Sequence, residues 1–274
     1  MKHMLEITSL QNPKMKTAAK LFDRRGRDET GLFLIEGYRE LSRALGGFVK
    51  IVTLFICPDL FLGENEQTLI DKAIRQGAQI FSSDQKVFKK LSYRDRPDGL
   101  IAVASQMQLS LDQLASKVLG KKNPVFLVAE SIEKPGNLGT ILRSCDAVGV
   151  DGVIVCDRCT DIYNPNVVRA SVGTLFTVPV VEAKGTEVLP WLKKHGVKIL
   201  SSTPNTDIEY TQADLSGPVA IVVGTEQLGL SDAWLSQADL KVRIPMMGVA
   251  DSLNVATATT LLLYEVLRQR RSSS

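Results

Sequence analysis

Residues 124–245 contain short runs that are wholly or mostly apolar, and this pattern constrains the fold more than any other feature. A strand covered on one face alternates apolar and polar residues, whereas a strand in a parallel sheet with helices on both faces is apolar throughout. The runs are VFLVA, GVIVC (152–156), KIL (198–200), AIVVG (220–224) and KVRIP (241–245). Amphipathic stretches separate them, so we predict a parallel α/β fold here.

The first third of the chain alternates β-branched or aromatic runs with amphipathic stretches, which predicts a second, smaller α/β domain. We expect strands at 31–37, 50–57, 79–83 and 99–105, and helices over 38–45, 66–76 and 84–91. This assigns residues 1–107 to an N-terminal domain. We interpret the polar stretch 108–123, which has room for one short helix, as a linker, and 124–274 as the C-terminal domain.

The charge of the chain is unevenly distributed. The net charge is only +3, but residues 1–110 carry 17 Lys and Arg against 13 Asp and Glu. Basic residues gather near the start of this part, at Lys14, Lys16, Lys20, Arg24, Arg25 and Arg27. Basic side chains along a phosphate backbone gain affinity by releasing counterions, so the stretch is either a nucleic-acid contact or a solvated helix face.

Several classes of protein are disfavoured. No apolar run approaches the ~20 residues of a membrane helix, and the N-terminus lacks a signal-peptide pattern, so we expect a cytoplasmic protein without a membrane partner. Four cysteines do not make a disulfide framework. Cys156 and Cys159 have the spacing of half a zinc site, but no second pair completes it, so we expect no metal. Neither glycine motif of dinucleotide or triphosphate sites is present.

The tryptophans and histidines of the chain do not indicate a catalytic or base-stacking role. Trp191 and Trp234 lie on amphipathic stretches and are expected to pack in the core. His3 and His195 belong to no motif, so we expect structural or solvent-exposed roles for them.

Three segments at the ends of the apolar runs contain glycines and polar residues, the composition of ligand-binding loops at the carboxyl edge of a parallel sheet. In the first, Asn137 occupies an expected helix N-cap and Arg143 follows six residues later. In the second, Gly224 ends a strand and Glu226 follows it. The third, 244–254, leads into a long helix. Each segment alone is also compatible with an ordinary capped connection.

Together the three segments match, in order and spacing, the motifs N-x-G-x-I-x-R (137–143), G-[ST]-E…G-L-S (224–231) and I-P-M…S-L-N (244–254). On these motifs, residues 124–270 resemble the TrmH/SpoU family of RNA ribose methyltransferases, within the SPOUT superfamily. EGYRELSRAL and PDGLIAVAS in the first third resemble the substrate-binding domain of many members. Cys145 and Thr225 are minor departures from the family pattern.

The resemblance implies a parallel sheet with a deep trefoil knot, S-adenosylmethionine as cofactor, RNA as substrate, and an obligate homodimer whose site is completed across the interface. It implies that Thr203, Gly224, Ile244 and Leu253 belong to the cofactor-binding loops.

The resemblance also implies catalytic roles. Arg143 is expected to engage the target ribose or phosphate, Asn137 to position substrate or loop, and Glu226 to hold the site in register. Ser252 and Asn254 are expected near the methyl donor, where either orients the hydroxyl. Because arginine stays protonated, we assign Arg143 to the stabilisation of oxyanion charge.

The sequence favours ribosomal RNA as substrate, because an N-terminal extension is commoner in that branch of the family. It leaves open a tRNA ribose methyltransferase, and a catalytically silent RNA-binding or ribosome-assembly factor. It does not separate housekeeping modification from antibiotic resistance.

Overall fold

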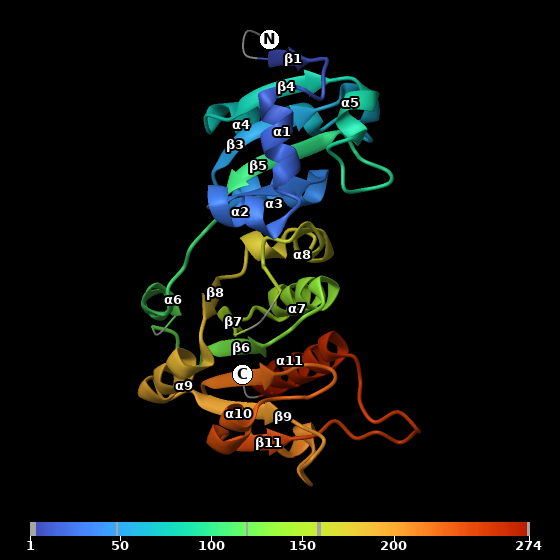
Figure 1. Cartoon of the computed structure of the whole chain (residues 1–274). Coiled ribbons are helices and arrows are strands. Elements are labelled where there is room, and N and C mark those ends of the chain that lie inside the picture. The colour runs from blue at the N-terminus through green and yellow to red at the C-terminus, as the bar shows by residue number, and fades with distance from the viewer. Residues whose placement is uncertain (1–3, 48, 119, 158–159, 273–274) are drawn as a thin grey trace. The chain divides into compact units, whose positions relative to one another are not determined.

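The computed structural model of the chain describes residues 4–47, 49–118, 120–157 and 160–272 (Figure 1). Its contacts divide it into two units. The first comprises Met1–Met107 with Asp161–Thr177, and the second comprises Gln108–Thr160 with Val178–Ser274. Each unit has its own sheet.

The first unit contains a mixed five-stranded sheet in the order β1-β4-β3-β5-β2. β1, β4 and β3 run parallel, whereas β5 is antiparallel to both β3 and β2. The strands are β1 (Met4–Ile7), β2 (Leu32–Glu36), β3 (Ile51–Ile56), β4 (Gln79–Ser83) and β5 (Leu100–Ser105). The predicted alternation of strands and helices in this part is confirmed, and β1 is an additional strand that the sequence pattern did not reveal.

The first unit also contains short helices. They are α1 (Pro13–Lys20), α2 (Arg24–Thr30), α3 (Tyr38–Gly46), α4 (Glu66–Arg75), α5 (Gln85–Lys89) and α8 (Pro165–Ala170), with 3₁₀ turns at Pro58–Leu60 and Thr174–Phe176. Amphipathic spacing explains α3, whose Leu41, Ala44 and Leu45 are buried on one face.

The segment Asp161–Thr177 belongs to the first unit although the sequence pattern assigned it to the C-terminal domain. Arg27 is 2% exposed, pairs with Asp161 at 2.6 Å, and donates to the carbonyl oxygens of Leu21 and Phe22. The Tyr163 ring packs at 4.5 Å from the Phe33 ring. The interpretation of Arg27 as a nucleic-acid contact is therefore wrong, because its buried guanidinium is hydrogen-bonded to Asp161 and to two backbone carbonyls.

The second unit contains a six-stranded sheet in the order β11-β9-β10-β6-β7-β8, and every neighbouring pair is parallel. The strands are β6 (Val125–Glu130), β7 (Gly152–Cys156), β8 (Val180–Ala183), β9 (Lys198–Ser202), β10 (Val219–Val223) and β11 (Leu240–Val242). All residues of β6, β7 and β10 are buried, which confirms the parallel sheet predicted from the apolar runs. The knot that the family resemblance implies stays a prediction.

The helices of the second unit are α6 (Leu111–Val118), α7 (Pro135–Val148), α9 (Gly185–Lys194), α10 (Asp232–Gln237) and α11 (Val255–Ser272), with a 3₁₀ turn at Tyr210–Gln212. Helix α6 lies in the expected linker, but its Leu114 and Val118 are buried in the core of this unit. Trp191 and Trp234 pack in the same core, as predicted. Helices α7 and α11 pack together (Figure 1). The Ser144 and Thr260 hydroxyls lie 2.7 Å apart between them.

Candidate active site

Three of the four residues predicted to bind cofactor follow neighbouring strands of the second unit, and the fourth, Leu253, lies in the loop before α11. Thr203 follows β9, Gly224 follows β10 and Ile244 lies just beyond β11, in a sheet whose order is β11-β9-β10-β6. The Thr203 amide donates to the carbonyl of Val242, the last residue of β11, at 2.9 Å. Parallel strands end at one edge, so the structure brings these loops together where open α/β sheets bind ligands.

The loop after β10 makes a very close backbone approach. A Cβ atom on Gly224 would lie 2.3 Å from the Gly229 carbonyl oxygen, so no side chain fits there. Thr225 and Gly229 exchange backbone hydrogen bonds of 3.0 and 3.1 Å, and Gly229 has φ +69°. The Thr225–Gly229 hydrogen bonds close a tight turn, and Glu226 lies in this turn just beyond the end of β10.

One polar side chain from each of the three motif segments and Lys134, just before the first, form a hydrogen-bonded cluster, which we call the loop junction: Lys134, Asn137, Glu226 and Asn254. Asn137 Nδ2 donates to Glu226 Oε1 at 3.1 Å. Asn254 Nδ2 donates to Glu226 Oε1 at 2.6 Å and to Asn137 Oδ1 at 3.1 Å. Lys134 forms an ion pair with the other oxygen, Oε2, of Glu226. The junction ties α7 to the loops after β10 and before α11.

The prediction that Asn137 caps α7 is wrong. The helix begins two residues earlier, at Pro135, with Lys134 at the N-cap position. Proline is favoured at the first helical position because its fixed φ suits the helix and its missing N–H would be unpaired there. Asn137 therefore lies inside the first turn, and its side chain is available for Glu226.

Two charged residues of this region were missed by the sequence analysis. Lys134 lies one turn before Asn137, and its hydrogen bond is the main reason why the pKa of Glu226 is lowered. Glu130 ends the apolar strand β6, is 6% exposed, and accepts a hydrogen bond from the Ser231 amide at 2.9 Å. A buried carboxylate that ends an apolar run was the available signal, because such a group needs a partner.

The two polar residues before α11, Ser252 and Asn254, have different surroundings. Asn254 Nδ2 has two hydrogens and both are used in the loop junction, while Oδ1 accepts from the Ala256 amide at 3.0 Å. Ser252 is exposed and has no hydrogen bond with any residue that the structure describes. Of the two, Ser252 has a side chain available to a ligand. Leu253 beside it is half-buried, as is Ile244.

Arg143 lies apart from the loop junction. It is exposed on α7 and has no hydrogen bond or ion pair within the described part of the chain. It follows Asn137 by six residues, which places it about 9 Å along the helix axis and about 120° around it. The structure of one chain therefore does not bring Arg143 together with the other predicted catalytic residues.

Among the described residues, the remaining cysteines and histidines are not arranged for catalysis or metal binding. Burial raises the pKa of the Cys145 thiol, which opposes formation of a reactive thiolate. His195 packs edge-on against Trp191, with ring centroids 5.0 Å apart. His3 and Cys159 lie outside the described residues. Among those described, no three His, Cys, Asp or Glu side chains are placed to hold a metal ion, and no helix is long and apolar enough to cross a membrane.

Comparisons with known proteins match both parts of the chain. Residues 124–264 match the SpoU rRNA Methylase family, and residues 12–102 match the MRM3-like substrate binding domain. The chain is 31% identical to the 23S rRNA (guanosine(2553)-2'-O)-methyltransferase RlmP of Bacillus subtilis, over 96% of this chain and 99% of that protein. It is 30% identical to the 23S rRNA (uridine(2479)-2'-O)-methyltransferase of Streptomyces viridochromogenes, over 97% and 93%.

A solved structure agrees with these matches. The AdoMet-bound rRNA methyltransferase from Sinorhizobium meliloti superimposes with a TM-score of 0.88, at 31% identity, over 97% of this chain and 98% of that chain.

A parallel sheet with glycine-containing loops at its carboxyl edge is typical of α/β proteins that bind a ligand at that edge. The chain belongs to the SpoU rRNA methylase family. It is an S-adenosylmethionine-dependent RNA ribose 2′-O-methyltransferase, which confirms the activity and the cofactor that the motifs predicted.

Proposed function

We propose that this enzyme methylates a ribose 2′-hydroxyl of ribosomal RNA at the edge of the sheet where the loop junction lies. The junction carries the proposal, because Asn137, Glu226 and Asn254 link the three motif segments through side-chain hydrogen bonds. Relatives whose names specify 23S rRNA support this substrate over tRNA. Those two relatives act on different nucleotides, so we leave the nucleotide of this enzyme unassigned.

The donor is held, in this proposal, by the loops of Thr203, Gly224, Ile244 and Leu253. The close packing of Gly224 against the Gly229 backbone fixes the course of the loop after β10, and the half-buried Ile244 and Leu253 offer apolar surface. These residues fit a cofactor that combines a flat base with polar groups. S-adenosylmethionine, when bound, supplies a sulfonium methyl group for in-line attack by the hydroxyl oxygen.

The acceptor is engaged by Arg143 and Ser252, the two predicted catalytic side chains that have no partner within the described residues. Arg143 binds the ribose or adjoining phosphate and stabilises negative charge as the hydroxyl loses its proton. Ser252 orients the hydroxyl. Asn137, Glu226 and Asn254 act as positioning residues, since their side chains are occupied by each other.

A homodimer completes the site. Arg143 makes no hydrogen bond or ion pair with the loop junction of its own chain, so we place it in the site of a partner copy, where two-fold symmetry would build the same arrangement twice. The exposed Lys14, Lys16 and Lys20 of α1 contribute RNA contacts. We place the enzyme in the cytoplasm with its RNA substrate.

The activity is tested by transfer of a radiolabelled methyl group from S-adenosylmethionine to ribosomal subunits lacking modification. A label retained in alkali-resistant dinucleotides identifies a 2′-O-methyl group, because the free 2′-hydroxyl is needed for alkaline cleavage. Arg143→Ala should lower turnover by about a hundredfold or more, as for loss of an oxyanion-stabilising group. The control Arg271→Ala removes another exposed arginine, on α11, and should keep parental activity. No alkali-resistant label with the parental enzyme would favour a silent RNA-binding factor.

The composite site is tested by mixing two defective variants. Arg143→Ala lacks the acceptor arginine and Gly224→Ala lacks a functional donor loop. If each site takes Arg143 and the donor loops from different copies, half of the exchanged dimers contain one intact site, and activity returns to about a quarter of the parental value. A mixture as inactive as its components, after exchange is verified by mass spectrometry, would place Arg143 and the donor loops of each site in one copy.

A further inference from the structure

The first unit contains a pocket of about 540 Å³ that the methyltransferase site does not use. Residues from α3, from the loop before α4, from the loop before β5 and from α8 line it, and we call it the α3–α4 pocket. Its charged lining includes Arg39, Glu66, Arg94, Asp98 and Arg169. This volume is within the range of small-ligand sites.

Two carboxylates in the α3–α4 pocket are buried and incompletely hydrogen-bonded. Glu66 is 4% exposed and Asp98 is 8% exposed. Glu66 Oε1 accepts from the amides of Leu62 and Gly63, at 3.2 and 2.9 Å, and Asp98 Oδ2 accepts from the amide of Tyr38, at 2.8 Å. Glu66 Oε2 and Asp98 Oδ1 have no hydrogen-bond partner in the described part of the chain. Both atoms are covered by neighbouring protein atoms, so a ligand donor reaches them only after the carboxylate groups rotate toward the pocket, and such acceptors are costly until a donor does so.

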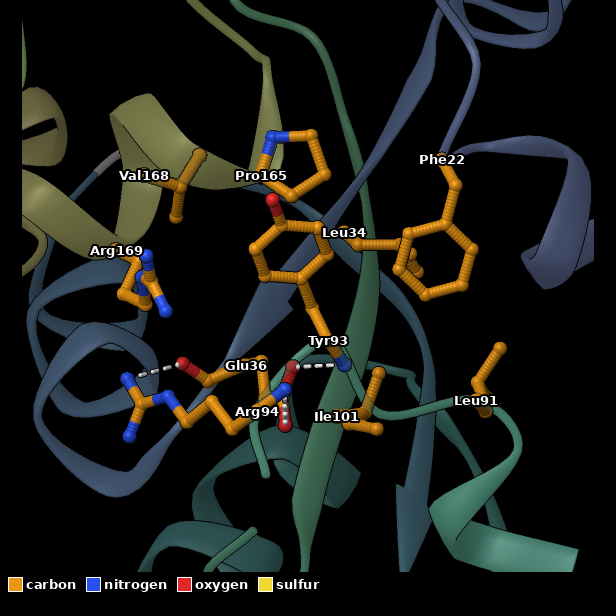
Figure 2. A pocket seen from close by; sticks show the side chains of 10 residues that line it. All are labelled: Phe22, Leu34, Glu36, Leu91, Tyr93, Arg94, Ile101, Pro165, Val168 and Arg169. Atoms are coloured by element: carbon orange, nitrogen blue, oxygen red, sulfur yellow. Dashed lines mark hydrogen bonds between the residues drawn. The ribbon is translucent and has the colours of Figure 1, made fainter. Parts of the chain in front are cut away.

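Arg94 adds an unused donor to the same pocket. Its Nη2 donates to Glu40 Oε1 at 2.6 Å and to the Glu36 carbonyl at 3.0 Å, whereas its buried Nε has no partner among the described residues. Figure 2 shows Arg94 and Arg169 beside Tyr93 in a neighbouring pocket. That pocket has a volume of only about 10 Å³, so of the two only the α3–α4 pocket has room for a ligand.

The distribution of charge in the α3–α4 pocket selects the chemistry of the ligand. Glu66 and Asp98 are buried and accept hydrogen bonds, whereas Arg39 and Arg169 are exposed cations that can pair with phosphate. A ligand that fits both has N–H donors at one end and a phosphate at the other. Guanine presents N1–H and N2–H donors next to the O6 acceptor, which matches two orphaned acceptors and one orphaned donor. Uracil presents one N–H donor.

We propose that the α3–α4 pocket binds one unpaired guanosine of the RNA substrate, with the base edge on Glu66, Asp98 and Arg94 and the phosphate on Arg39 or Arg169. Single-stranded RNA is read in this way, through hydrogen bonds to the edges of unstacked bases. The inference rests on the proposed function, because the RNA substrate supplies the guanosine. It gives the first unit a sequence-selective contact separate from the donor site.

The test titrates the full-length protein with two RNA heptamers, one with a single central guanosine among uridines and one of uridines only. The guanosine heptamer should bind about tenfold tighter or more, since each good base-edge contact contributes about 1–3 kcal/mol. Guanosine monophosphate should bind more weakly than that heptamer, and uridine monophosphate should not saturate. Equal affinity for the two heptamers, or tighter binding of the free nucleotide than of the guanosine heptamer, would overturn the proposal.

Variants assign the guanosine preference to the pocket. Glu66→Gln keeps one oxygen for the amides of Leu62 and Gly63 but replaces the orphaned acceptor by a donor, so the preference should fall to about twofold or less. Glu64→Gln, a matched change at an exposed neighbour, should keep it. An unchanged preference in Glu66→Gln would contradict the assignment. S-adenosylmethionine titration of the same samples reports separately on folding and on the proposed methyltransferase function.

Discussion

The loop junction of the second unit and the α3–α4 pocket of the first unit use the same kinds of side chains in opposite ways. In the junction, Glu226 is exposed to solvent, yet both of its oxygens have protein partners. In the pocket, Glu66 and Asp98 are buried, yet each leaves one oxygen without a protein partner. The first arrangement holds loops in place, whereas the second leaves buried acceptors for a ligand to complete.

Of the changes that test this contrast, we expect the largest effect from a substitution in the backbone that supports the loop junction. Gly224→Ala forces a Cβ atom onto the Gly229 carbonyl, so the loop after β10 must move. We expect affinity for S-adenosylmethionine to fall by about a hundredfold, or about 2.8 kcal/mol of binding free energy, because the loop that holds the donor must shift to relieve this overlap. Calorimetry measures it. Gly217→Ala, where nothing lies within 4 Å of the added carbon, is the control, and equal affinities of the two variants would contradict this account of the loop.

A smaller effect is expected from the side chains of the junction. Asn254→Ala removes two donated hydrogen bonds and the cap on the Ala256 amide. Loss of such bonds costs about 1–2 kcal/mol, so donor affinity should fall by about tenfold. Ser252→Ala should leave donor affinity within about twofold, because the side chain makes no bond that positions the loops. Stopped-flow or calorimetric titration distinguishes the two, and the opposite order would contradict the assignment of Asn254 to positioning.

The smallest effect is a pH dependence. The pKa of Glu226 is lowered below its usual value of 4.5, mainly by the hydrogen bond from Lys134. A carboxyl whose pKa is lower in the folded state contributes stability that is complete above its unfolded pKa and is lost as the pH falls through its folded pKa. Thermal unfolding between about pH 3 and 7 should therefore show a steeper acid loss in the parental protein than in Glu226→Gln. Identical profiles would show that the ion pair contributes nothing measurable.

Sequence patterns predicted the central strands of the second unit well, because parallel strands covered on both faces leave a continuous apolar run in the sequence. They missed β8 (Val180–Ala183), a four-residue edge strand in which only Val181 is fully buried. They extended the last strand to Pro245, whereas β11 ends at Val242 and Arg243 forms only an isolated bridge with Glu209. Short and partly exposed strands lack the length that makes an apolar run recognisable.

The sequence identified most residues of the candidate site but not the contacts between them. The motifs identified Asn137, Glu226 and Asn254, which the structure joins directly. Their partner Lys134 was not predicted, because a lysine before a proline resembles any solvated residue until the fold brings Glu226 to it. The α3–α4 pocket was not predicted either. Its carboxylates are far apart in sequence, since Glu66 begins α4 and Asp98 lies in the loop before β5, and nothing local distinguishes Glu66 from its exposed neighbour Glu64.

The most direct test of the account is calorimetric titration of the parental protein with S-adenosylmethionine and with its demethylated product, in parallel with Glu66→Gln and Gly224→Ala. The account predicts saturable binding of both compounds to the parental protein and to Glu66→Gln with equal affinity, and strongly weakened binding to Gly224→Ala. Absence of binding to the parental protein at about millimolar concentration, where the binding free energy is only about −4 kcal/mol, would contradict the donor site at the edge of the parallel sheet.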